Sequence, residues 1–319
     1  MDRQIDILVL CDMCVDFLVS GEDVVPEFRQ KEKLVGDYVL EMGGSNCIFA
    51  CQAAKLGLEV TALGKVGNDV FGQLILEKLK KSGVNTEHVI VDPDEKTGVG
   101  IQLCKKDDRA ILTYSGTIDA LTIDDIPELL LNKCRHLHVG SYFLMNRIRP
   151  YIGEIMKRVK QAGSTVSLDT NWDPEEEWDG GLKDLFPYVD VFLPNENELL
   201  AISGEDYVNT ALEKLGERIG IVVVKMGEKG AIGFSKGKKV YCSSLKVDYV
   251  DSVGAGDSFD AGFIYGYLNG LSLEECLKIA CICGAFNTTA RGGIKGQIDI
   301  KKLNEILENE RSVLDVRIL

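Results

Sequence analysis

A run of small residues in the last third of the chain leads directly into a carboxylate. Gly254, Ala255 and Gly256 precede Asp257, where an apolar pattern of helical period begins. Glycines allow a tight turn and the close approach of a ligand, and the first N–H groups of a helix attract phosphate. A carboxylate in such a place is unfavourable unless it has a chemical role, such as taking the proton of an attacking hydroxyl group. The segment therefore predicts an anion hole with Asp257 as general base; the alternative is a glycine turn that only starts a helix.

Four other segments combine polar side chains with glycines or with the expected start of a helix. The paired glycines of the second segment permit close approach to a small polar ligand. The third suits phosphate or hydrated Mg²⁺, with helix capping as the alternative. The fourth would let a nucleotide lie against the backbone, unless it is a plain hairpin turn. In chain order, the segments are Asp12 with Asp16, Gly43-Gly44-Ser45-Asn46, Asn195-Glu196-Asn197-Glu198, and Lys225 with Gly227 and Gly230.

The elements that must position these groups alternate along the chain. Fully apolar strands that alternate with helices are typical of an α/β fold in which a doubly wound, mostly parallel sheet carries helices on both faces. Ligands bind at the carboxyl ends of such strands, where the polar candidates fall. A capping role is expected for Asp69. The patterns predict strands at Ile5–Leu10, Leu137–Val139, Thr165–Leu168, Val189–Leu193 and Ile221–Val224, and helices at Cys47–Leu56, Asp69–Lys81, Pro150–Gln161, Asn209–Gly216, Asp257–Leu268 and Leu273–Thr289.

Two segments, residues 17–40 and 97–115, alternate apolar and polar residues without a helical period. They predict a small antiparallel sheet set apart from the main one, within a single domain that spans residues 1–319. Such an appendage commonly serves as a lid that excludes water from a reaction. Ordinary edge hairpins are the alternative.

The composition excludes several classes of function. A net charge of −14 argues against nucleic acid as a partner, and no apolar run approaches the roughly 18 residues of a membrane span. The N-terminus shows no secretory pattern, so we expect a cytoplasmic protein whose ten cysteines are small buried hydrophobic residues. The Walker, Rossmann and serine-hydrolase motifs are missing. The three histidines are expected to be structural.

The site segments follow one another in a specific order: Asp16, Gly43-Gly44, Gly67-x-Asp69-x-x-Gly72, Asp169-x-Asn171, Asn195-x-x-Glu198, Gly227-x-x-Gly230, and Asp251 to Phe259. In this order, over essentially the whole chain, they resemble the ribokinase/PfkB family of carbohydrate kinases. The resemblance implies a ribokinase-like domain with a β-sheet lid. It also implies transfer of the γ-phosphoryl group of ATP to a hydroxyl group of a small sugar or sugar acid. Mg²⁺, often a monovalent cation such as K⁺, and in many members a homodimer formed through the lid are further implications.

The resemblance implies a role for each position. Asp257 resembles the catalytic base, and the N–H groups of Gly254, Ala255 and Gly256 resemble the anion hole. Asp251 and Val253 fall where ligands of a monovalent cation are placed. The acceptor candidates are Asp12, Asp16, Gly43, Gly44 and Asn46, and the nucleotide and Mg²⁺ candidates are Asn195, Glu198, Lys225, Gly227, Gly230 and Gly256.

The chain departs from the family pattern mainly around the acceptor. Cys11 and Cys14 stand where a glycine and an asparagine are common. Ile48 stands where an asparagine is usual, with Asn46 two residues earlier. Lys225 replaces the usual threonine or serine and could place a positive charge beside an ATP phosphate. The reaction is therefore better supported than the identity of the acceptor.

Three alternatives stay open. A nucleoside kinase is disfavoured because the sequence shows no extra aromatic cluster suited to stacking a base. A sugar-phosphate kinase would need cations near the lid, for which Arg109, Arg147 and Arg149 are candidates. A non-catalytic sugar-binding regulator would have no need of Asp257.

Overall fold

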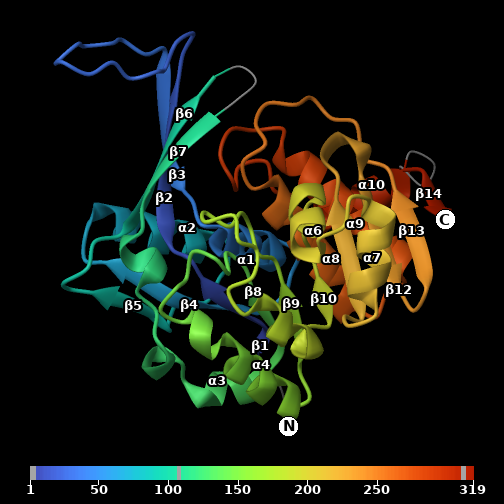
Figure 1. The fold of residues 1–319 in the computed structure, drawn as a ribbon. Helices are drawn as coiled ribbons and strands as arrows, with labels where there is room; N and C mark the ends of the chain where they lie inside the picture. The colour runs from blue at the N-terminus through green and yellow to red at the C-terminus, as the bar shows by residue number, and fades with distance from the viewer. Residues whose placement is uncertain (1–4, 106–108, 310–313) are drawn as a thin grey trace.

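The main body of the protein is a ten-stranded sheet that runs across Figure 1. A computed structural model describes residues 5–105, 109–309 and 314–319. All neighbours from β5 to β11 are parallel, whereas β11 to β14 pair antiparallel. This order confirms the doubly wound, mostly parallel sheet. Across the sheet the strands are β14 (Val316–Ile318), β13 (Lys238–Cys242), β12 (Ala231–Ser235), β11 (Ile221–Lys225), β10 (Val191–Phe192), β9 (Thr165–Leu168), β8 (Cys134–Val139), β1 (Ile5–Cys11), β4 (Val60–Gly67) and β5 (Val89–Asp92).

Helices cover both faces of this sheet because its strands are apolar on both sides. In β1, Ile7, Val9 and Cys11 face one helical layer while Leu8 and Leu10 face the other, and all five are buried. The first layer contains α1 (Ser45–Lys55), α2 (Val70–Lys81), α8 (Ala255–Leu268) and α9 (Leu273–Asn287), and α10 (Ile300–Asn309) packs on α9. The second contains α3 (Glu128–Lys133), α4 (Ile152–Gln161), α5 (Leu182–Leu185), α6 (Glu196–Ser203) and α7 (Val208–Gly216).

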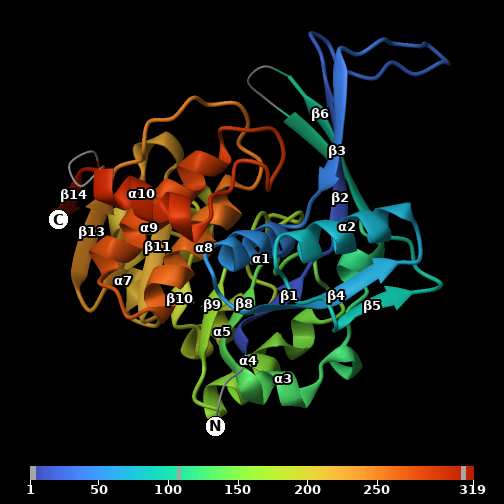
Figure 2. The same ribbon diagram turned by 180° about the vertical axis from the view of Figure 1, so that it is seen from behind.

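A separate four-stranded sheet rises from the main body (Figures 1 and 2). Its order is β3 (Asp37–Met42), β2 (Cys14–Ser20), β6 (Gly98–Cys104) and β7 (Arg109–Tyr114). Of the two segments expected to form it, residues 21–36 contain no strand and residues 106–108 lie outside the described residues. The expectation of a purely antiparallel sheet is wrong, because β2 and β6 pair in parallel. Each hairpin is antiparallel by itself, and the two hairpins join side by side.

Local signals determine where several elements begin. Helix α2 begins at Val70 because Asp69 Oδ1 accepts the N–H groups of Phe71 and Gly72, at 3.0 and 2.8 Å. Helix α8 begins at Ala255, two residues earlier than expected, because Gly254 has a φ of 75° and turns the chain into the helix. In the described part of the chain, no helix has the length and hydrophobicity needed to cross a membrane.

Candidate active site

The carboxyl ends of five neighbouring strands bring four predicted residues together with Ser141, which was not predicted. Asp12 follows β1, Ser141 follows β8, and Asp169 follows β9. Asn195 follows β10, and Lys225 ends β11. Because these strands are adjacent in the sheet, side chains from widely separated parts of the sequence meet at one edge.

Asp12 holds the loop that carries the two glycines. Its Oδ2 accepts the Ser45 N–H at 3.1 Å and the Ser141 hydroxyl at 2.6 Å, and its Oδ1 accepts the Asn46 N–H at 2.9 Å. Burial raises the pKa of Asp12, and these donors oppose that rise. Asp12 thus caps the first turn of α1, which makes it a positioning residue for this loop.

Asp16, on β2, lies against Gly43 where the small sheet meets the main body. A Cβ atom at Gly43 would lie 2.6 Å from Asp16 Cγ, and one at Gly100 would lie 2.7 Å from Asp16 Oδ1. Any larger residue at either position would displace the carboxylate. We call the group formed by Asp12, Asp16, Gly43 to Asn46, Ser141 and Asn171 the acceptor end of the site.

Asn46 lies in the first turn of α1 with its amide unpaired. The residue is 0% exposed, and neither Oδ1 nor Nδ2 has a partner in good hydrogen-bond geometry, although the side chain lies close enough to Asp12 to lower the pKa of that carboxyl group. An unsatisfied buried polar group costs on the order of 1–3 kcal/mol, and a ligand would recover this energy by hydrogen bonding only where movement of the glycine loop exposes the amide. Ile48 instead packs on the anion-hole loop, since its Cγ2 lies 2.9 Å from the place of a Cβ atom on Gly254.

Ser141 was not expected at the site, and the structure gives Ser45 and Asn171 specific roles there. Asn171 Nδ2 donates to Ser45 Oγ at 2.8 Å and to Ser141 Oγ at 2.9 Å. Asn171 and Ser141 also have positive φ angles of 55° and 50°, and strained backbone of this kind clusters at functional sites. Ser45 and Asn171 lie in segments that the sequence singled out, whereas Ser141, two residues after the predicted strand Leu137–Val139, was not named. The position of Ser141 depends on contacts between strands.

Asp257 lies buried in the first turn of α8. Its carboxylate interacts with the hydroxyl of Ser45, which joins it to the acceptor end. Burial, followed by the charge of Asp169, raises the pKa of Asp257 well above its ordinary value, and Lys225 opposes this shift. The Ala255 N–H donates to the Ser252 carbonyl at 3.2 Å. Of the predicted anion-hole donors, the Ala255 N–H is therefore engaged within the loop itself.

Lys225 lies between two buried carboxylates. Its Nζ is 2.9 Å from Asp169 Oδ2 and 2.9 Å from Asp260 Oδ2. A Cβ atom at Gly256 would lie 3.6 Å from the same Nζ, so the ammonium group borders the first turn of α8. Burial would lower the pKa of Lys225, but Asp169 and Asp260 raise it above its ordinary value. Sequence reasoning missed Asp260, although it stands three residues after Asp257 and so on the same side of the helix.

Asn195 and Glu198 form a capping box at the start of α6. Glu198 Oε2 accepts the Asn195 N–H at 2.9 Å, and Asn195 Oδ1 accepts the Glu198 N–H at 3.0 Å. Burial, and then the charge of Asp169, raises the pKa of Glu198 to about 7. The helix capping expected as the alternative role of this segment is therefore present. The Glu198 carboxylate also belongs to the charged group around Lys225. We call Asp169, Glu198, Lys225, Asp257 and Asp260 the phosphate end of the site.

Gly227 and Gly230 lie in the hairpin that joins β11 to the antiparallel β12. A Cβ atom at Gly230 would lie 2.0 Å from the Cys242 carbonyl oxygen, whereas one at Gly227 would meet no atom within 4 Å. Packing against β13 therefore requires a glycine at position 230, whereas a side chain at position 227 would meet no neighbouring atom. The hairpin is present, and contact with a nucleotide stays a prediction.

Asp251 and Val253 are tied into the loop before α8. Asp251 accepts the N–H groups of Val253 at 3.1 Å and of Gly292 at 2.9 Å. The Val253 carbonyl accepts Asn287 Nδ2 at 2.7 Å. No three His, Cys, Asp or Glu side chains are grouped as a metal site among the residues that the structure describes. A metal ion here would take most of its ligands from phosphate and water, as Mg²⁺ usually does.

The remaining candidates lie apart from this group. The Arg147 N–H donates to Asp119, Arg149 lies 6.0 Å from the ring centroid of Tyr142, and the side chain of Arg109 lies outside the described residues. His136 and His138 are buried and hydrogen-bonded to hydroxyl groups, as a structural role requires. Nine of the ten cysteines are buried, and all ten are free thiols.

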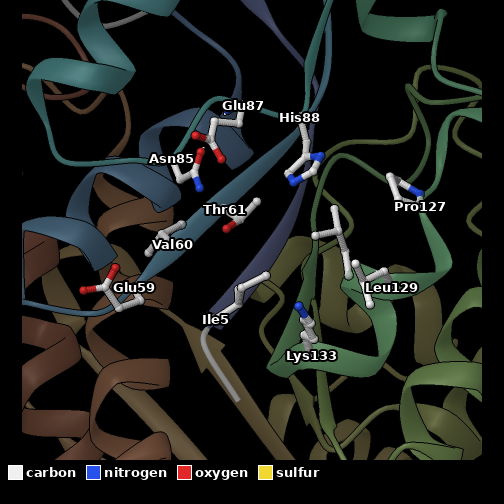
Figure 3. Close-up of a pocket in the computed structure, with 11 residues that line it drawn as sticks. Ile5, Glu59, Val60, Thr61, Asn85, Glu87, His88, Pro127, Leu129 and Lys133 are labelled. Atoms are coloured by element: carbon white, nitrogen blue, oxygen red, sulfur yellow. Dashed lines mark hydrogen bonds between the residues drawn. The ribbon is translucent and has the colours of Figure 1, made fainter. Parts of the chain in front are cut away.

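A surface pocket of about 260 Å³ lies at the opposite edge of the sheet, near the start of β1 and β4 (Figure 3). Glu59, Glu87 and Asn85 there are exposed, and none of the predicted site residues lines the pocket. Its lining comprises Ile5, Glu59, Val60, Thr61, Asn85, Glu87, His88, Pro127, Leu129, Leu130 and Lys133.

Comparison with known proteins identifies relatives of this arrangement. Residues 7–300 match the family model described as pfkB family carbohydrate kinase. The 2-dehydro-3-deoxygluconokinase of Bacillus subtilis is 30% identical over 85% of this chain and 88% of its own length. Arabidopsis thaliana ribokinase, solved with ribose and ATP, superposes with a TM-score of 0.81 at 25% identity, over 95% of this chain and 98% of that one. An Escherichia coli protein assigned as ribokinase II, solved with ATP and Mg²⁺, gives a TM-score of 0.84 at 24% identity, over 96% and 100%.

Proposed function

Because the chain belongs to the PfkB family of carbohydrate kinases, we propose that it transfers the γ-phosphoryl group of ATP to a hydroxyl group of a small sugar or sugar acid. Asp257 accepts the proton of that hydroxyl group as the oxygen attacks. In the turn Gly254-Ala255-Gly256, the N–H groups other than that of Ala255 stabilise the charge on the transferred group together with the N–H group of Asp257. The observation that carries this proposal is the position of Asp257, a buried carboxylate in the first turn of a helix, in contact with Ser45 and near Lys225.

The environment of Asp257 suits a general base. A carboxylate with a raised pKa binds a proton more firmly than an ordinary aspartate, and an effective base has a pKa closer to the working pH. Lys225 limits the rise in the pKa of Asp257 and supplies positive charge beside the transferred phosphoryl group. The proton leaves the hydroxyl group in the same step in which the new O–P bond forms and the bond to ADP breaks.

The acceptor end and the nucleotide loop complete the assignment. Asp16, Gly43, Gly44 and Asn46 contact the sugar, and Asp12 holds their loop in place. Lys225, Asn195 and the hairpin of Gly227 and Gly230 border the ATP phosphates. Glu198 would hold Mg²⁺ through water, and the ion, when bound, offsets phosphate charge. Asp251 and Val253 would border a monovalent cation such as K⁺.

The small sheet is proposed to act as a lid over the acceptor. Strand register places Asp16, Gly100, Glu41 and Thr113 in one row on one face. Asp16 of this row meets Gly43, and Glu41 pairs with Lys295 and, at 3.3 Å, with Lys78. The face that carries Asp16 therefore borders the acceptor end. A lid of this kind keeps water from competing with the sugar hydroxyl group.

The other face of the lid is proposed to form a homodimer. Register places Leu40, Phe17, Ile101 and Leu112 in one apolar row, and Leu112 is 61% exposed. A continuous exposed apolar face of this kind marks an interaction site, and a second copy of the chain offers a matching face. Sedimentation equilibrium of the full chain tests this, since a mass of one chain at all concentrations would contradict it. The free thiols favour a reducing compartment, and we place the enzyme in the cytoplasm.

The decisive experiment compares the wild-type enzyme with Asp257→Asn on a panel of pentoses, hexoses and keto-sugar acids, with ADP release as the readout. We expect kcat to fall at least about a hundredfold while ATP affinity stays within a few-fold, because the substitution removes only the base. If the wild-type enzyme released ADP with none of these acceptors, the kinase assignment would be contradicted. A variant that retains most of its kcat would contradict the role of Asp257.

A further inference from the structure

An aromatic cluster that the sequence did not predict follows two residues of the acceptor end, Ser141 and Asn171, directly along the chain. Its rings belong to Tyr142 and Phe143, which follow β8, and to Trp172 and Trp178, which follow β9. Phe143 and Trp178 meet edge to face with their ring centroids 5.9 Å apart, and Trp178 and Trp172 do so at 4.9 Å. Tyr142 meets Phe143 in the same way at 5.3 Å. The sequence did not reveal this cluster, because strand pairing assembles its rings from two separate segments.

The inner members of this cluster are held firmly. Tyr142 is 2% exposed and donates its hydroxyl group to the Gly180 carbonyl at 2.7 Å. The backbone N–H of Trp178 donates to Asp173 Oδ2 at 2.7 Å, and Asp173 Oδ1 accepts the backbone N–H of Glu175 at 3.1 Å. These bonds fix the loop on which both tryptophans lie. Trp172 is thus braced from behind by a rigid set of rings.

Trp172 itself is 49% exposed, although it is one of the largest apolar side chains in the protein. It directly follows Asn171, whose amide is bonded to Ser45 and Ser141 at the acceptor end. Consecutive Cα atoms are about 3.8 Å apart, so the backbone of Trp172 lies at the margin of the acceptor end. A braced and half-exposed indole in this position offers a flat apolar surface with a fixed orientation.

From this arrangement we propose that Trp172 is a specificity-determining residue that stacks on the apolar face of the phosphoryl acceptor. The inference rests on the proposed kinase function and adds a chemical requirement to it. The acceptor joins a phosphorylatable hydroxyl group to a flat apolar surface, which is either the C–H face of a sugar ring or the base of a nucleoside. The unpaired amide of Asn46 serves the polar edge of the same molecule, while Trp172 serves its apolar face.

The kinetic test substitutes Trp172 and measures both substrates. We expect Trp172→Ala to raise the acceptor KM about five- to tenfold, in line with the energy of an aromatic contact, and to leave the KM for ATP unchanged. Trp172→Phe should restore most of the loss. Tyr207→Ala is the matched control, because Tyr207 is a 74% exposed aromatic residue immediately before α7 and outside the acceptor end, so its loss should change neither constant. An acceptor KM within twofold of wild type in Trp172→Ala would overturn the proposal.

A binding test works without turnover. The chain contains two tryptophans, so Trp178→Phe leaves Trp172 as its sole indole fluorophore. Titration of this variant with ribose, fructose, adenosine and uridine should change its emission in a saturable way with the acceptor that is phosphorylated. Should that variant fold poorly, comparison of wild type with Trp172→Phe isolates the same signal. Saturable binding of an acceptor with no change in Trp172 emission would also overturn the proposal.

The panel separates the two sources of the apolar face. If Trp172→Ala raises KM for free sugars, the stacked surface is the sugar ring. If it raises KM for nucleosides alone, the stacked surface is the base. Both results support stacking on Trp172. Failure of the kinase assignment would look different. In that case the wild-type enzyme would turn over no acceptor, while the fluorescence titration could still detect binding.

Discussion

The two ends of the site differ in how far their polar groups are already paired. At the phosphate end, Lys225 lies between Asp169 and Asp260, and Glu198 is held by Asn195. At the acceptor end, Asn46 is fully buried and both of its amide atoms lack partners. A buried charge cannot persist without compensation, whereas an unpaired neutral amide costs only on the order of 1–3 kcal/mol. The charged groups at the phosphate end are therefore compensated by Lys225, although Asp260 Oδ1 has no hydrogen-bond partner of its own, whereas both unpaired atoms at the acceptor end belong to a neutral amide.

This difference separates reaction from recognition. The phosphate end is organised before any ligand arrives, as is required of groups that stabilise charge during a reaction common to every acceptor. The acceptor end has the unpaired amide of Asn46, and the half-exposed indole of Trp172 lies at its margin; under the proposed function, the substrate would complete these contacts. Substitutions at the phosphate end should then affect kcat and stability, and those at the acceptor end should affect acceptor KM.

The largest effect should come from Lys225→Met, which removes the cation between two buried carboxylates. We expect a loss of about 3–5 kcal/mol in the free energy of unfolding and a large fall in kcat. Because Lys225 lowers the pKa of Asp257, its loss should also move the acidic limb of the pH–rate profile to higher pH. Thermal denaturation and a pH profile measure both effects.

Two control variants test this prediction: one keeps the positive charge at position 225, and the other also neutralises its partner Asp169. Lys225→Arg should retain more stability than Lys225→Met. The double variant Lys225→Met/Asp169→Asn should recover part of the loss, because it no longer buries the unpaired charge of Asp169. A Lys225→Met enzyme as stable as wild type would show that the phosphate end is not organised by this pair.

An intermediate effect is expected from Asn46→Ala. The substitution should raise the acceptor KM about tenfold, the equivalent of one or two hydrogen bonds, and change the free energy of unfolding by less than about 1 kcal/mol, because the lost packing is offset by removal of an unsatisfied amide. Gln52→Ala is the matched control. Gln52 is buried on the same helix and has an unpaired Oε1, but its Nε2 donates to the Ile298 carbonyl at 2.7 Å. The Gln52→Ala variant should be less stable than wild type, with an unchanged acceptor KM. An equal rise in acceptor KM in both variants would contradict the proposed difference between the two ends.

A pH-dependent effect on stability is expected from Glu198→Gln. The folded pKa of Glu198 is about 7 against an ordinary value of 4.5. A raised carboxyl pKa contributes stability that is fully present below the unfolded pKa and is lost as pH rises through the folded one. Wild type should therefore lose up to about 3 kcal/mol relative to the variant between pH 4 and pH 8. Glu196→Gln, on the same helix but more exposed, should show no such slope in chemical denaturation series, and parallel curves for wild type and Glu198→Gln would contradict the shift.

Much of the fold could be predicted because it depends on local patterns. Strand β9 begins and ends at the residues expected from its apolar run, and Asp69 caps α2 as its position indicated. The parallel pairing of β2 with β6 could not be predicted, because alternation shows which face a residue takes and not which strand lies beside it. The start of α8 was displaced for a local reason, the left-handed Gly254.

The sequence by itself determined the α/β architecture, the helix start that presents Asp257, and the order of motifs that marks a phosphoryl-transfer site. These features follow from periodicity, capping residues and glycine turns, which act over a few neighbouring residues. Only the tertiary structure decided that Lys225 pairs with Asp169 and Asp260, that Asp12 serves the glycine loop, and that Trp172 stands braced at the margin of the acceptor end. Those contacts join residues from separate strands and helices, so they exist only once the sheet has brought its carboxyl ends together.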